Sequence, residues 1–153
     1  MNYQKTSEYY NPAIYIWLLT ITAMVLGIIV VGGLTRLTDS GLSITDWRPI
    51  LGIIPPLTYD NWVSVFNMYK STPEFKIVNK NMSLNEFKYI FWWEWWHRIF
   101  ARIIGIIFIL PLIYFVIKKQ LSYYLFRRLL IVLIFGIFQA FVGWWMVKSG
   151  LTE

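Results

Sequence analysis

Three long stretches of the chain are almost entirely apolar, and polar segments separate them. They run from about 13 to 34, from about 91 to 117 and from about 129 to 147. The shortest has 19 residues, and a helix of that length nearly spans the roughly 30 Å hydrocarbon core of a bilayer. The pattern therefore predicts an all-α integral membrane protein with three transmembrane helices.

A long polar connection, residues 35–90, lies between the first two apolar stretches. It is rich in Thr, Ser, Asp, Gly and Pro, which favour turns and loops. Loops of this length are usually either functional or disordered, and the aromatic residues in this one favour an ordered structure. Near its end, Ser83-Leu-Asn-Glu86 is a capping-box pattern, which predicts the start of a helix.

Basic residues predict the orientation in the membrane. Lys118, Lys119, Arg127 and Arg128 lie close together between the second and third apolar stretches. Dense Lys and Arg next to membrane spans favour the cytoplasmic side. We therefore expect a cytoplasmic N-terminus, with the long loop 35–90 and the C-terminus on the extracytoplasmic side.

Composition changes this picture in two ways. Hydrophobic residues make up 58% of the 153 residues, which supports the membrane assignment and makes lipid a partner. The chain has no Cys, which excludes disulfides and thiolate metal sites. The net charge of +6 is scattered among apolar spans and does not form one soluble patch, so we expect no nucleic-acid partner.

One stripe of the second apolar stretch carries every charged or small residue of the segment 91–105. At 3.6 residues per turn it consists of Glu94, His97, Arg98, Ala101, Arg102 and Gly105. His97 is the only histidine of the chain. An imidazole beside guanidiniums suits an axial ligand of haem iron, with Arg98 and Arg102 placed to bind the propionates. The small residues would let a flat macrocycle approach the backbone.

Other interpretations of this stripe remain open. The histidine and the arginines would also be compatible with side chains that only reach to lipid headgroups near a Trp-rich boundary. Glu94 and Arg98 are four residues apart, a spacing that allows a simple structural ion pair. A Glu-x-x-His pair also occurs in di-iron bundles, but these need further carboxylates on facing helices, which the three spans lack.

Several separated motifs resemble one known family. They are residues 31–49 (VGGLTRLTDSGLSITDWRP), 73–75 (PEF), 87–98 (FKYIFWWEWWHR) and 143–151 (GWWMVKSGL). Together they closely resemble haem A synthase of the cysteine-free type found in proteobacteria and mitochondria. The resemblance implies oxidation of a methyl group of haem O to the formyl group of haem A, for cytochrome c oxidase.

The resemblance also implies roles for residues. The family motif Glu-x-x-His-Arg maps onto Glu94, His97 and Arg98, which makes His97 an axial iron ligand and Glu94 a residue needed for the oxidation. The family has eight transmembrane helices in two four-helix halves. Each half supplies a pair of histidines from its second and fourth helices. Haem O, the substrate, binds in the N-terminal half, and a haem b cofactor binds in the C-terminal half.

Compared with that pattern, the sequence stops after its third span. We therefore expect residues 1–153 to be a single truncated transmembrane domain, an N-terminal piece of the enzyme or one component of a split enzyme. The partner of His97 would then be missing, which leaves open whether this chain alone is an enzyme. The alternatives are a non-catalytic haem-binding or assembly protein and an inactive gene fragment.

The expected partners follow from the resemblance. They are haem O, a polypeptide that supplies the missing helices, haem O synthase and cytochrome oxidase assembly factors. The expected location is the bacterial inner membrane, or the mitochondrial inner membrane in a eukaryote.

Overall fold

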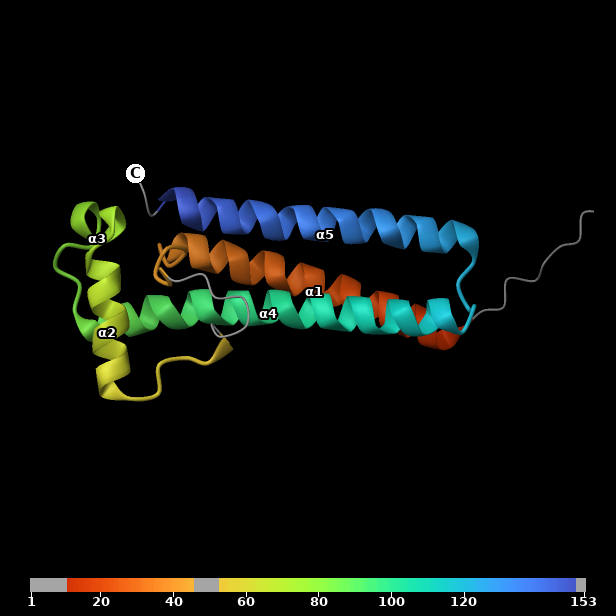
Figure 1. Cartoon of the computed structure of the whole chain (residues 1–153), viewed down its shortest axis with the longest axis horizontal. Coiled ribbons are helices and arrows are strands. Elements are labelled where there is room, and N and C mark those ends of the chain that lie inside the picture. Colours follow the sequence, from red (N-terminus) through yellow and green to blue (C-terminus); the bar gives the residue numbers. More distant parts are fainter. Residues whose placement is uncertain (1–10, 46–52, 151–153) are drawn as a thin grey trace, which may run out of the picture.

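The computed structural model describes residues 11–45 and 53–150, and it contains only helices and irregular segments in these ranges. Three long helices, α1 (Pro12–Leu37), α4 (Leu84–Ile117) and α5 (Tyr123–Gly150), run along the long axis. Two short helices, α2 (Tyr59–Lys70) and α3 (Pro73–Ile77), form a cap at one end (Figure 1). The three long helices are long and apolar enough to cross a membrane. The prediction of an all-α membrane protein with three spans is confirmed.

The membrane helices extend beyond the apolar stretches that predicted them, and α4 does so most. It begins at Leu84, two turns before residue 91, and the predicted capping box between Ser83 and Glu86 forms its start. Its 34 residues reach about 51 Å at 1.5 Å per residue, well beyond the hydrocarbon core. Pro111 lies inside the helix, which continues past it to Ile117.

The first turns of α4 pack against the cap. The buried aromatic and aliphatic residues of this contact are Trp62, Phe66 and Tyr69 of α2 with Phe87, Ile90 and Phe91 of α4. The amide of Asn79 donates a hydrogen bond of 2.8 Å to the Tyr69 hydroxyl. Burial raises the pKa of Tyr69, and this hydrogen bond partly offsets the rise. The middle of the long connection is therefore a folded cap that holds the extramembrane end of α4.

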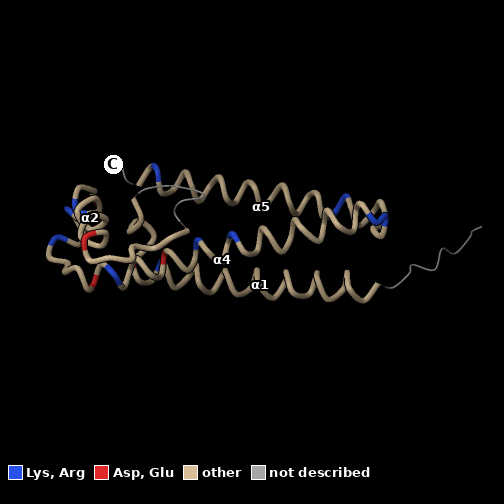
Figure 2. Tube along the Cα trace, turned by 60° about the horizontal axis from the view of Figure 1, so that its bottom comes forward, with Lys and Arg blue, Asp and Glu red and all other residues tan. Residues whose placement is uncertain are grey.

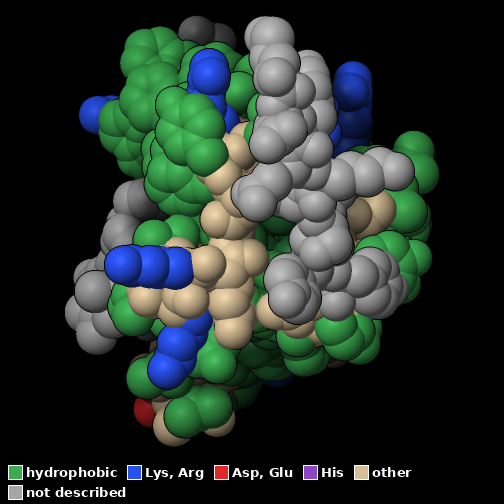
Figure 3. All heavy atoms as spheres, turned by 90° about the vertical axis from the view of Figure 1, so that its right-hand side faces the viewer, with side chains coloured by type: hydrophobic (Ala, Val, Ile, Leu, Met, Phe, Trp, Pro, Cys, Tyr) green, Lys and Arg blue, Asp and Glu red, His purple; other side chains and the backbone are tan. Residues whose placement is uncertain are grey.

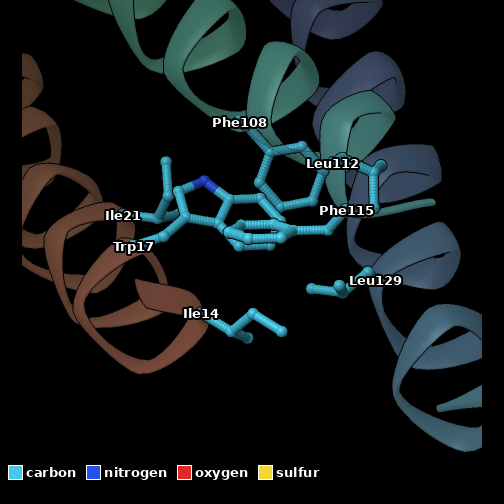
Figure 4. Packing of buried hydrophobic residues seen from close by; sticks show 7 residues of the cluster. All are labelled: Ile14, Trp17, Ile21, Phe108, Leu112, Phe115 and Leu129. Carbon is cyan, nitrogen blue, oxygen red and sulfur yellow. The ribbon is translucent and has the colours of Figure 1, made fainter. Parts of the chain in front are cut away.

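Within the membrane part, α1 packs along α4 in the antiparallel direction. The indole N–H of Trp17 donates to the carbonyl of Ile107 at 2.8 Å. Gly27 allows a close approach, because a Cβ there would lie 3.2 Å from the ring of Phe100. At the end of the molecule opposite the cap, α1, α4 and α5 form an apolar cluster (Figure 4). It consists of Ile14, Trp17, Ile21, Phe108, Leu112, Phe115 and Leu129.

Two buried side chains of α5 lie near its opposite ends, and the middle of the helix is exposed. Leu129 joins the apolar cluster and Val147 is buried near the other end. Between them, Ile134, Phe135, Ile137 and Phe138 are each at least 60% exposed. The middle of α5 therefore presents apolar side chains that the rest of the described chain does not cover.

Charge is distributed unevenly between the two ends of the molecule. The basic residues Lys118, Lys119, Arg127 and Arg128 lie at the turn between α4 and α5, and no acidic residue of the described chain lies at that end (Figure 2). Seen from this end, basic side chains project among hydrophobic ones (Figure 3). The capped end carries residues of both signs (Figure 2).

Candidate functional site

The residues expected to form the site occupy one stripe of α4, and the structure places three of them beside α1. Glu94, His97 and Arg98 each approach α1 or the segment that follows it. Arg102 lies one turn beyond Arg98 on the same stripe and is half-buried. The helical spacing predicted this common face, and the packing of α1 determines what the face contacts.

Glu94 is buried, with 3% of its surface exposed, and its carboxylate accepts hydrogen bonds at both oxygens. Oε2 accepts from the Ser43 hydroxyl at 2.7 Å and from the Ile44 backbone N–H at 2.8 Å. Oε1 accepts from Arg98 Nη2 at 2.5 Å. A buried carboxylate is costly unless it is both paired and hydrogen-bonded. These three donors therefore explain how a charged group is held inside this packing.

Arg98 closes this arrangement into a ring of contacts. Its Nη2 donates to the carbonyl of Ile44 at 3.1 Å as well as to Glu94. The same residue, Ile44, thus donates to the carboxylate and accepts from the guanidinium. The structural ion pair considered for Glu94 and Arg98 is present, and it is part of a larger network that ties α4 to the segment after α1.

His97 lies on the neighbouring part of the face, against α1. A Cβ at Gly32 would lie only 3.3 Å from Nε2 of His97, so the glycine lets the imidazole lie close to α1. The imidazole is half-buried. None of the side-chain hydrogen bonds found among the described residues involves His97. A neutral imidazole can bind a metal ion through one of its ring nitrogens. A side chain larger than that of Gly32 would occupy the position beside Nε2.

Aromatic residues of α4 flank the stripe that carries His97. Trp92 and Trp96 are 37% and 58% exposed, as expected for indoles at a membrane boundary. Trp95 packs edge-on against Trp96 and donates from its indole nitrogen to the carbonyl of Ile53 at 3.1 Å. This hydrogen bond therefore ties the segment before α2 to α4, close to the stripe that carries His97.

A metal site built only from side chains is not found in the ranges 11–45 and 53–150. No three His, Asp or Glu side chains gather there in a way that could hold an ion. The single imidazole can instead contribute one ligand to an iron that a porphyrin already holds through its own nitrogens.

Sequence reasoning did not identify Gly32, Ser43 or Ile44 as part of the site. They lie more than 45 residues before Glu94, and helical periodicity relates only residues on the same helix. Ser43 and Ile44 belong to the segment that the pattern assigned to a loop. The one signal in the sequence that could have pointed to them is their position within residues 31–49, the first motif of the family resemblance.

Together, the fold and the site define a membrane protein in which one spanning helix presents a histidine, a buried carboxylate and arginines at a single face. The chain belongs to the cytochrome oxidase assembly protein family, which matches residues 15–153. No solved structure matches the chain.

Curated relatives agree with this assignment. The chain is 48% identical to the haem A synthase of Parvibaculum lavamentivorans over 150 residues, which cover 98% of the chain and 43% of that protein. It is also 48% identical to the haem A synthase of Maricaulis maris over 153 residues, which cover 100% of the chain and 44% of that protein. It is also 49% identical to a haem A synthase–mitochondrial ferredoxin fusion protein of Schizosaccharomyces pombe, covering 98% of the chain and 24% of that protein. The chain thus spans less than half the length of these relatives.

Proposed function

We propose that this chain forms part of the substrate site of a haem A synthase, where a methyl group of haem O is oxidised to the formyl group of haem A. Family membership and the similarity to named haem A synthases support this function. The observation that carries it is the position of His97. Its imidazole is half-buried on α4, and its Nε2 lies against Gly32 of α1.

The residues present fit a haem. His97 would supply a nitrogen ligand to the iron, and Gly32 leaves free the position beside its Nε2 that a Cβ would fill. The bound haem would supply both the iron and the methyl group that is oxidised. Arg98 and Arg102 are the candidates for its propionates. Because Nη2 of Arg98 already bonds Glu94 and Ile44, a propionate would use the remaining N–H groups of this guanidinium.

Glu94 would act on the reaction through its charge. It lies one turn before His97, and Ser43, Ile44 and Arg98 hold its carboxylate in place. A fixed carboxylate stabilises positive charge that develops during the oxidation of a methyl group. Because both of its oxygens already accept hydrogen bonds, electrostatic stabilisation suits this carboxylate better than proton uptake.

The proposed reaction requires more than this chain. The relatives are more than twice as long, so a polypeptide with the remaining helices would supply a second ligand and a haem b. Haem O synthase and cytochrome oxidase assembly factors are the proposed partners for delivery and use of the haem. The ferredoxin fused to the relative from Schizosaccharomyces pombe supports an electron-transfer partner as well.

We also propose that the chain lies in the bacterial inner membrane, or in the mitochondrial inner membrane, with its N-terminus in the cytoplasm or matrix. The uniformly basic turn between α4 and α5 supports this orientation. The cap, which carries residues of both signs, would then lie on the opposite side, together with the end of α4 that carries Glu94 and His97.

Co-expression tests the proposed function. The chain would be produced with a polypeptide matching the rest of the Maricaulis maris relative, in cells that make haem O, and haem would be extracted from the membranes. We expect haem A from the wild-type pair. We expect the Glu94→Gln pair to retain haem, because His97 and not Glu94 is the proposed iron ligand. The same pair should form no haem A, because it lacks the charge proposed to act on the oxidation. If the wild-type pair retained haem but formed no haem A, the proposed enzymatic function would be contradicted, and a non-catalytic haem-binding protein would be favoured.

A further inference from the structure

The segment that follows α1 forms a turn that is stabilised by hydrogen bonds. Asp39 has a φ of 48°, the left-handed conformation that ends many helices. The Asp39 N–H donates to the carbonyl of Arg36 at 3.3 Å, and the Ser40 N–H donates to the carbonyl of Thr35 at 3.0 Å. The Ser40 side chain is fully buried, and its hydroxyl donates to the same carbonyl at 3.0 Å. Hydrogen bonds within the segment itself therefore support the first part of this turn.

Ser43, three residues further on, is also fully buried and faces α4. Its oxygen lies 2.7 Å from Glu94 Oε2 and 3.4 Å from the carbonyl of Ile90. A hydroxyl has one proton to donate, and hydrogen bonds to a charged acceptor are shorter and stronger than those to a neutral one. Ser43 therefore donates to the carboxylate. The N–H of Ile44 donates to the same oxygen at 2.8 Å.

These two donors determine where the carboxylate of Glu94 points. A glutamate side chain has several rotatable bonds, so its position on α4 alone would allow many orientations. Two donors on Oε2 and Arg98 on Oε1 restrict it to one. A charged group on the same face as His97 is useful to a reaction only when it is held in place beforehand.

We propose that Ser43 is a positioning residue of this site, whose hydroxyl acts with the Ile44 N–H to hold the Glu94 carboxylate in one orientation on the His97 face. The inference rests on the proposed function for what Glu94 does in the reaction. The holding contact itself is a property of this chain and is measured without any reaction. Ser43 is thus assigned to the site although it lies 51 residues before Glu94.

Two serine variants form a matched pair for the test. Ser43→Ala and Ser40→Ala each remove one fully buried hydroxyl from the same turn, but only Ser43 contacts Glu94. The whole chain would be placed in lipid nanodiscs with carbon-13-labelled glutamate. The infrared band of the Glu94 carboxylate would be identified by its loss in Glu94→Gln. Hydrogen exchange at the Ile44 amide would be followed in the same samples.

We expect Ser43→Ala to shift the Glu94 carboxylate band, because the serine hydroxyl no longer donates to Oε2. We expect exchange of the Ile44 amide to speed by about tenfold, because a carboxylate that is free to turn holds this N–H less firmly. Ser40→Ala should leave both unchanged. In the co-expressed pair, Ser43→Ala should lower haem A formation by about tenfold with haem retention unchanged.

The outcomes separate the two proposals. An unchanged Glu94 band and unchanged Ile44 exchange in Ser43→Ala would overturn the positioning role, whatever the yield of haem A. Equal effects in Ser40→Ala and Ser43→Ala would also overturn it, because the folding of the turn would then explain both. A shifted band in Ser43→Ala without any haem A in the wild-type pair would support the positioning contact and contradict the proposed function.

Discussion

A buried carboxylate such as that of Glu94 depends on each of its donors. Removing one partner of a buried ion pair typically costs about 3 to 5 kcal/mol, because the remaining charge stays buried without compensation. Arg98 supplies the opposite charge, and Ser43 and Ile44 supply neutral donors on the other oxygen. At the scale of the residue, the same contacts that offset the burial of the Glu94 charge also hold its carboxylate in one orientation.

Gly32 offers a sharp test of this face. A methyl group in Gly32→Ala would lie 3.3 Å from Nε2 of His97, whereas a Cβ at Gly33 would meet no other part of the described chain within 4 Å. Both changes replace glycine with alanine at neighbouring positions of α1, so their effects on helix stability should be similar. We expect Gly32→Ala to weaken haem binding several-fold, and Gly33→Ala to leave it close to wild type, as measured by haem titration of the purified chain.

The comparison of the two variants decides the outcome. Wild-type haem affinity in both Gly32→Ala and Gly33→Ala would show that the space beside Gly32 is not used, and that haem approaches His97 from another direction. A comparable loss in both variants would point to the packing of α1 rather than to this space.

Part of the site could be predicted from the sequence. The spacing of Glu94, His97 and Arg98 on one helix follows from 3.6 residues per turn, and so does the ion pair between Glu94 and Arg98. The contacts with Ser43 and Gly32 could not be derived in this way. They depend on how α1 packs against α4 and on the turn after α1, which no periodicity within one helix describes.

At the scale of the element, α4 shows what an apolar pattern does and does not define. The pattern located the part that suits lipid, starting near residue 91. The helix begins at Leu84 because the capping box starts it there and because α2 covers its first turns with aromatic side chains. The capping box was visible in the sequence, but the packing partner of these turns was not.

The end of α4 allows a stability prediction. Lys119 has a φ of 54°, its N–H donates to the carbonyl of Val116, and the Gln120 N–H donates to that of Phe115. Glycine is favoured at such a position because it has no Cβ. We expect Lys119→Gly to stabilise the chain by about 0.5 to 1 kcal/mol against unfolding in mixed detergent micelles.

Lys118→Gly is the matched control for Lys119→Gly. It removes the same charge one residue earlier, where φ is −77° and a side chain is not strained. Lys118→Gly should therefore be neutral or destabilising. A gain in stability of equal size in both variants would attribute the effect to charge rather than to the backbone conformation of Lys119.

At the scale of the whole molecule, the sequence predicted three spans and their order, but not the position of α5. The small residues Gly136 and Gly143 suit a close helix contact, yet within residues 11–45 and 53–150 no atom of another element lies within 4 Å of a Cβ at either position. The middle of α5 is exposed in the described part of the chain, which spans less than half the length of the relatives that it matches.

The most direct test of the account is the absorption spectrum of the purified chain after addition of haem O, compared between wild type and His97→Ala. We expect the wild-type chain to bind haem weakly with a distinct Soret band, because it offers one imidazole ligand. His97→Ala should lose this band while it still inserts and folds. The same Soret band and the same affinity in both proteins would show that His97 does not bind the iron, and would contradict the proposed site.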